Sequence, residues 1–284
     1  MNIYDIAKLA NVSIATVSRV VNNSPKVSPK TKEKVLAVMK ENEYTPNAFA
    51  RGLGLGSMKT VGIICPNIDD IYMAKAVSYL EQNLHAHGYD CILGCSGFKQ
   101  EEKEDYVRLL LSKKIDTLIL VGSTYAGNGK DESDTDYIRE AAEQVSIFMI
   151  NAKVSGDNIY CTYADDFQAT YEVTKAFIRR GKEKILFMYD SESYSARQKM
   201  AGYEAALQDA GYPIRGNLKF KTRNDIEYTR DMLLEYNRTL DFDSVLATED
   251  GIAIGAVKYA KIKGLAIPEE LAVVGYNNSI LAIS

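Results

Sequence analysis

From Thr60 onward, short apolar runs alternate with amphipathic stretches of about 12–16 residues. The apolar runs are rich in β-branched residues, which is typical of parallel strands that are covered on both faces. Because alternating strands and helices build doubly wound sheets, this pattern predicts an α/β body. The predicted strands are Val61–Cys65, Cys91–Gly94, Thr117–Val121, Ser146–Ile150, Lys184–Tyr189, Ser244–Ala247 and Leu271–Gly275.

The alternation continues to the end of the 284 residues, a length that fits two doubly wound lobes better than one. Residues 151–163 have the weakest pattern, so the crossover between the lobes is predicted there. We therefore expect a first lobe at residues 59–157 and a second at residues 158–284. Two such lobes form the architecture of periplasmic sugar-binding proteins.

The first 45 residues follow another pattern, which predicts three short helices. The first begins near Ile3 and ends before Asn11, a residue that tolerates the left-handed conformation of a helix end. Ser13 can cap a second helix over residues 14–21, and Ser28-Pro29 can open a third. These helices predict an all-α helix-turn-helix head over residues 1–45, followed by a hinge helix or linker over residues 46–58.

The net charge of −4 hides a strong asymmetry. Residues 1–60 carry nine Lys or Arg and four Asp or Glu, whereas the rest of the chain carries 25 and 34. Phosphates attract the basic head and are repelled by the acidic body, so nucleic acid is expected at one end only.

The outward face of the second helix has side chains suited to the major groove of DNA. Arg19 can donate two hydrogen bonds to a guanine, whereas Ile14 and Ala15 can contact a thymine methyl. Thr16, Ser18 and Lys30 suit phosphates. Taken alone, Arg19 would more often be a solvated surface arginine, but the surrounding head favours the DNA interpretation.

Three segments of the head carry a resemblance to a known family: Tyr4-Asp5-Ile6-Ala7, residues 12–20 (VSIATVSRV) and Tyr44-Thr45-Pro46-Asn47-Ala48. Together they resemble the lactose-repressor (LacI/GalR) family of bacterial regulators. The resemblance continues through Arg179-Arg180-Gly181, residues 201–207 (AGYEAAL), residues 252–256 (IAIGA) and residues 273–278 (VVGYNN), and so covers nearly the whole chain.

The resemblance implies a homodimer that binds a palindromic operator in double-stranded DNA, most simply as a repressor. A leucine that matches Leu53 would wedge into the minor groove once the hinge becomes helical on DNA. Glycines 52, 54 and 56 weaken a free hinge helix, so its ordering should require the operator. The expected DNA-binding residues are Tyr4, Ser13, Ile14, Ala15, Thr16, Ser18, Arg19, Asn22, Lys30, Asn47, Ala50, Arg51 and Leu53.

In two-lobed α/β proteins a ligand binds at the carboxyl ends of the strands, in the cleft between the lobes. The resemblance implies a small effector there, held by Asp69, Tyr72, Met73, Asn151, Arg197, Lys199, Glu249 and Asn277. Lys199, Glu249 and Asn277 stand where the family commonly has Arg, Asn or Ser, and Asp, so the effector cannot be copied from a relative. Hydroxyl-rich ligands suit this set, which favours a sugar or sugar derivative; a phosphoprotein corepressor and a nucleobase are the alternatives. Whether the effector releases DNA or promotes its binding stays open.

Other classes of protein fit the sequence less well. We expect no catalytic residue, metal site or cofactor, because the only histidines (85 and 87) suit a helix end and no catalytic motif stands out. A periplasmic binding protein would lack the head. A DNA-binding regulator that responds to no ligand is the main alternative.

The sequence also predicts the compartment. The N-terminus has no secretory signal, no stretch is apolar enough to span a membrane, and four cysteines in apolar runs suggest buried, reduced thiols. We therefore expect a cytoplasmic protein. Family members continue beyond the position of Ser284 with a P-x-L-T-[TS]-V segment, so we expect this chain to lack the last part of the second lobe and part of the dimer surface.

Overall fold

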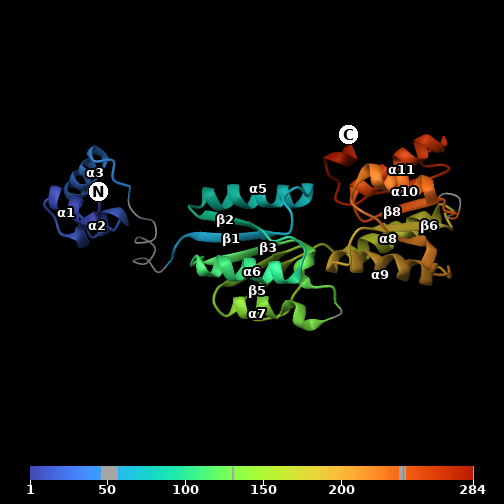
Figure 1. Ribbon diagram of the computed structural model, residues 1–284, viewed down its shortest axis with the longest axis horizontal. Helices are drawn as coiled ribbons and strands as arrows, with labels where there is room; N and C mark the ends of the chain where they lie inside the picture. The colour runs from blue at the N-terminus through green and yellow to red at the C-terminus, as the bar shows by residue number, and fades with distance from the viewer. Residues whose placement is uncertain (46–56, 130, 237–238, 240, 284) are drawn as a thin grey trace.

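The computed structural model describes residues 1–45, 57–129, 131–236, 239 and 241–283. A small helical head, a first α/β lobe and a second α/β lobe follow one another along the long axis (Figure 1). Both the all-α head and the two-lobed, doubly wound body confirm the predicted fold class. None of the helices described is long and apolar enough to cross a membrane.

Three helices with well-capped ends form the head: α1 (Ile3–Leu9), α2 (Ile14–Val21) and α3 (Pro29–Glu41). The Ser13 side chain accepts a hydrogen bond from the Thr16 backbone N–H at 3.1 Å, and Ser28 caps α3 in the same way. Asn11 has a φ of +48°, the left-handed conformation predicted for the end of α1. The three helices bury a core built from Ile6, Ala7, Ala10, Val17, Val20, Val35 and Met39.

The first lobe is a five-stranded parallel sheet in the order β2-β1-β3-β4-β5. Helix α5 covers one face, and α6 and α7 cover the other (Figure 1). The elements are β1 (Thr60–Cys65), α5 (Ile71–Ala86), β2 (Asp90–Cys95), α6 (Gln100–Ser112), β3 (Thr117–Val121), η1 (Ser123–Ala126), η2 (Glu132–Thr135), α7 (Asp136–Ala142), β4 (Ser146–Ile150) and β5 (Ile159–Thr162).

The second lobe is a four-stranded parallel sheet in the order β7-β6-β8-β9. Helices α8 and α9 pack on one face, and α10 and α11 on the other. The elements are α8 (Asp166–Arg179), β6 (Ile185–Tyr189), α9 (Tyr194–Asp209), η3 (Gly216–Leu218), β7 (Lys219–Lys221), α10 (Ile226–Tyr236), β8 (Ser244–Ala247), α11 (Asp250–Lys263), β9 (Ala272–Val274) and η4 (Ile280–Ile283).

All seven predicted strands are present, and two short edge strands, β5 and β7, were not predicted. Strand β5 pairs with β4, so the first sheet extends to Thr162. The predicted boundary at residues 157 and 158 would place this strand in the second lobe, and in this respect it is wrong. All four cysteines are free thiols, but only Cys65 is buried and Cys95 is exposed, which corrects the prediction that all are buried.

Gly202 sets the close packing of α8 on α9. A side chain at this position would place its Cβ 2.1 Å from the backbone oxygen of Phe167 on the neighbouring helix. Only glycine therefore fits where these two helices meet.

Candidate functional site

A cavity of about 680 Å³ lies between the two lobes. Its lining comes from the loops and helix starts that follow the carboxyl ends of strands in both sheets. This is where open α/β sheets bind ligands, because adjacent loops diverge there and leave a crevice. The fold alone therefore makes this cavity the candidate effector site.

The first lobe contributes the start of α5. Asp70 caps this helix, and its Oδ1 accepts a hydrogen bond from the Met73 backbone N–H at 2.9 Å. The cap fixes the first turn, which presents Tyr72 and Met73 to the cavity. Burial raises the pKa of the Tyr72 hydroxyl, so it stays a neutral hydrogen-bonding group.

Lys199 of α9 is the buried cation of the second lobe. Its side chain is only 3% exposed, and its Nζ donates to the Thr248 backbone oxygen at 3.1 Å. The same ammonium lies 3.7 Å from the centre of the Tyr276 ring. Burial lowers the pKa of Lys199, while Glu249, Asp166, Asp190 and Asp250 act in the opposite direction. Lys199 thus offsets part of the negative charge of the surrounding carboxylates.

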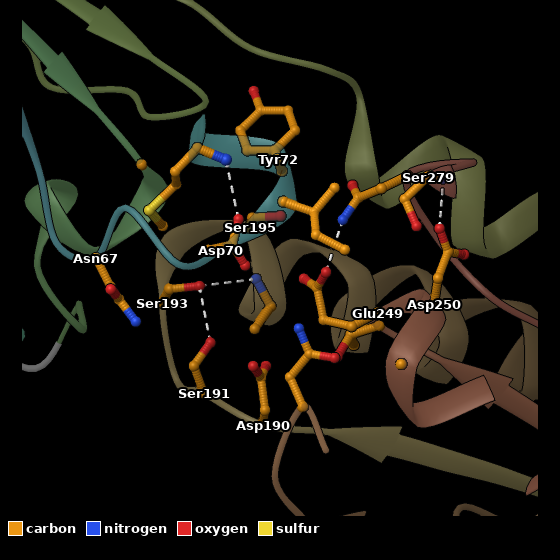
Figure 2. Close-up of a pocket in the computed structure, with 18 of the residues that line it drawn as sticks. Asn67, Asp70, Tyr72, Asp190, Ser191, Ser193, Ser195, Glu249, Asp250 and Ser279 are labelled. Carbon is orange, nitrogen blue, oxygen red and sulfur yellow. Dashed lines mark hydrogen bonds between the residues drawn. The ribbon is translucent and has the colours of Figure 1, made fainter. Parts of the chain in front are cut away.

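Two carboxylates at the start of α11 are held by the loop after β9. Asn277 Nδ2 donates to Glu249 Oε2 at 2.6 Å, and the Ser279 backbone N–H donates to Asp250 Oδ2 at 2.6 Å (Figure 2). Burial raises the pKa of Glu249 to about 8, even though Lys199 opposes that shift. The loop after β9 and the start of α11 therefore form one wall of the cavity.

The loop after β6 and the first turn of α9 supply lining residues that the sequence analysis did not single out: Asp190, Ser191, Ser193 and Ser195 (Figure 2). Ser193 caps α9, and its Oγ accepts hydrogen bonds from the Ala196 backbone N–H at 3.3 Å and from the Ser191 hydroxyl at 3.1 Å. Burial raises the pKa of Asp190. Because Asp190 directly follows a correctly predicted strand, the strand-end rule could have found it.

Seven of the eight predicted effector residues line the cavity: Asp69, Tyr72, Met73, Asn151, Lys199, Glu249 and Asn277. Their contact with an effector stays a prediction. Arg197 is absent from the lining; instead, its Nη1 donates to the Glu192 backbone oxygen at 2.9 Å and to the Gly127 backbone oxygen of the first lobe at 3.2 Å. Residues two apart on a helix point about 200° away from each other, so Arg197 and Lys199 cannot both face the cavity.

The head exposes most of the predicted DNA-binding residues. Tyr4, Ser13, Ile14, Ala15, Arg19 and Lys30 are exposed, and Thr16 and Ser18 are half-buried. Asn22 ends α2, and its Oδ1 is buried without a hydrogen-bond partner among the described residues, so that oxygen is turned inward. Asn47, Ala50, Arg51 and Leu53 lie outside the described residues.

Among the described residues, no group of three His, Cys, Asp or Glu side chains is placed to hold a metal ion. The cavity offers hydroxyls, amides, carboxylates, two aromatic rings (Tyr72 and Phe98) and a buried ammonium. These groups suit the binding of a polar molecule through hydrogen bonds.

Comparisons with known proteins cover both parts of the chain. Residues 2–47 match the model of "Bacterial regulatory proteins, lacI family", and residues 58–281 match "Periplasmic binding proteins and sugar binding domain of LacI family". An HTH-type transcriptional regulator of Lachnoclostridium phytofermentans is 48% identical over 282 residues, which cover 99% of this chain and 84% of that protein. Catabolite control protein A of Priestia megaterium is 30% identical, with 99% and 84% covered.

Solved structures agree on the fold. The lac repressor dimer bound to operator and the anti-inducer ONPF has a TM-score of 0.86 at 23% identity, with 99% of this chain and 83% of that chain covered. Proteins of this group are transcriptional regulators and not enzymes. On the two family models and the 48% identical relative, this chain belongs to the LacI family of DNA-binding transcriptional regulators.

Proposed function

We propose that this chain represses transcription in the cytoplasm as a dimer bound to a palindromic operator. The supporting observation is the exposed face of α2, where Ile14, Ala15 and Arg19 stand opposite the buried Val17 and Val20. A helix of this kind enters the major groove, and two copies read two half-sites of a symmetric sequence. The lac repressor, which shares the fold, is a dimer bound to operator in its solved structure.

The second part of the proposal is control by a small, hydroxyl-rich effector in the cavity between the lobes. The loops of both lobes line this cavity, so a ligand that contacts both would favour one arrangement of the lobes. Through a dimer, that arrangement sets the spacing of the two heads and hence the affinity for the operator. A transcriptional regulator named CelR, which has a similar fold, was solved in complex with cellobiose.

Selection of binding sites from random DNA tests the first part. The expected result is an inverted repeat that binds with nanomolar affinity at moderate salt. Operator binding is then measured by fluorescence anisotropy with and without a panel of sugars, after calorimetric titration identifies those that bind. Selection of an asymmetric site or of no site would contradict the operator part, and a panel without any binder would contradict the effector part.

A further inference from the structure

The cavity is strongly acidic. Seven of its lining side chains are carboxylates, and Lys199 is the one cation among the lining residues that the structure describes. Lys199 is fully engaged, because it is buried, donates to the Thr248 oxygen and lies against the Tyr276 ring. An incoming anion would therefore meet carboxylates rather than a free cation.

Three of these acidic side chains come from different lobes and line the same cavity. Asp70 belongs to the first lobe, whereas Asp190 and Glu249 belong to the second (Figure 2). The charge of Asp70 contributes to the raised pKa of both Asp190 and Glu249, because the three carboxyl groups would repel one another if all of them were ionised. Lys199 lowers the pKa of both residues without cancelling the effect of burial.

A positive charge between the lobes would relieve this repulsion. The geometry does not favour a metal ion here, since no three acidic, His or Cys side chains of the described residues are grouped to hold one. An organic amine is larger, brings its own hydrogen-bond donors and can span carboxylates that are further apart. The buried Thr248, which lines the cavity, also has an Oγ1 without a partner among the described residues and can bond a ligand hydroxyl.

We propose that the effector is a sugar that carries an amino group, a proposal that rests on the proposed function. The ammonium of this sugar binds between Asp70 of one lobe and Asp190 and Glu249 of the other. Its hydroxyls meet the remaining amides and hydroxyls of the cavity. Sugars that carry a phosphate or a carboxylate are excluded by the same carboxylates. Because the ammonium joins groups from both lobes, its binding favours their closure.

The test compares matched sugars that differ only in charge. The full chain is titrated by calorimetry with D-glucosamine, D-galactosamine and D-mannosamine, with the corresponding hexoses, and with their 6-phosphates. At least one amine should bind about tenfold or more tightly than its uncharged hexose, and the phosphates should not bind.

Two variants test the position of the charge. Asp70→Asn keeps the cap of α5, because asparagine is an equally good N-cap, and Asp190→Asn preserves the shape of that side chain. Each should remove most of the preference for the amine over the hexose. Asp165→Asn is the matched control, since Asp165 caps α8 in the same way and is not among the lining residues.

The experiment distinguishes a failure of the charge assignment from a failure of the proposed effector function. Binding of a hexose or a phosphate as tight as that of the amine, or a preference that survives in both variants, would overturn the charge assignment and leave the proposed sugar sensor intact. If no compound binds while the protein still binds its operator, both the charge assignment and the effector part of the proposed function fail.

Discussion

The head and the cavity assemble their functional side chains in different ways. In the head, one helix of eight residues, α2, presents most of the predicted base-reading side chains, and Ser13 at its own N-terminus fixes where it begins. In the cavity, the lining residues lie between Asn67 and Leu281 in the sequence and come from several elements of both lobes. A local sequence thus determines the first site, whereas only the complete body determines the second. Changes to each site should therefore separate DNA binding from effector binding.

Among these variants, Ile6→Ala in the head should separate DNA binding from effector binding most strongly. Ile6 is fully buried in a small core, and the cavity left by an isoleucine-to-alanine change costs about 2–5 kcal/mol. So small a domain has little stability to lose, so operator binding should disappear in an anisotropy titration. The melting of the body, followed by calorimetry, should stay unchanged. Leu9→Ala, at an exposed position of the same helix, is the control and should bind the operator normally.

Gly202→Ala should have the opposite effect, because it should impair the body and its effector binding while the head stays intact. The new Cβ would meet the Phe167 backbone oxygen, so α8 and α9 must move apart at a cost of about 1–3 kcal/mol. The melting temperature of the body should fall, and effector binding should weaken, while the helical head stays folded. In Gly216→Ala the added methyl group meets open space, so this variant should melt like the parent chain. Equal melting of the two variants would contradict the packing role of Gly202.

Arg19→Ala should weaken specific operator binding and leave the cavity untouched. A lost bidentate contact to guanine costs about 1–3 kcal/mol of discrimination. Competition with operators changed at single positions should show that the variant no longer distinguishes one base pair. If the variant discriminates between base pairs as well as the parent chain at every position, Arg19 does not contact a base and instead faces solvent or contacts a phosphate.

Glu249→Gln tests the buried charge of the cavity through pH. The folded protein holds the pKa of Glu249 at about 8, above its ordinary value of 4.5, so the folded state keeps a proton that the unfolded state releases between these values. The stability from this group is full below pH 4.5 and is lost as the pH rises to about 8, with a slope of about 1 kcal/mol per pH unit. Melting at pH 5.5 and 8 should show a smaller decline in Glu249→Gln than in the parent chain. The exposed Glu172→Gln should keep the parental decline.

The smallest effect is expected from Lys30→Ala. Lys30 is exposed at the start of α3, where it suits a phosphate. Its loss should weaken binding similarly for all sequences and should reduce the slope of log affinity against log salt by about 1. A change confined to one operator sequence would instead give Lys30 a base-reading role.

The contrast between the sites also explains what the sequence could predict. Caps, helix ends and the stripe of Val17 and Val20 depend on neighbours a few residues away, so the three helices of the head were predicted correctly. Long apolar strands were predicted for the same reason. Strand β7 has three residues, two of them lysines, and β5 has only four residues, so only their pairing with β6 and β4 reveals them.

The cavity was predicted in part. Asn151 directly follows β4 and Glu249 comes two residues after β8, so both could be placed by the strand-end rule. Asn224 also lines the cavity, but it follows the unpredicted β7, so the strand-end rule could not identify it. Arg197 was assigned by sequence proximity to Lys199, although the turn of α9 separates the two side chains.

The link between the two lobes is very short. Strand β5 ends at Thr162 and α8 begins at Asp166, whose Oδ1 accepts a hydrogen bond from the Tyr276 hydroxyl at 2.5 Å. Only residues 163–165 lie between, and a fully extended chain of this length keeps the Cα atoms of Thr162 and Asp166 within about 15 Å. This short connection keeps the end of β5 close to the start of α8, so the two lobes cannot separate widely at this point. Any opening of the cleft should therefore be largest at the parts of the lobes that lie farthest from residues 163–165.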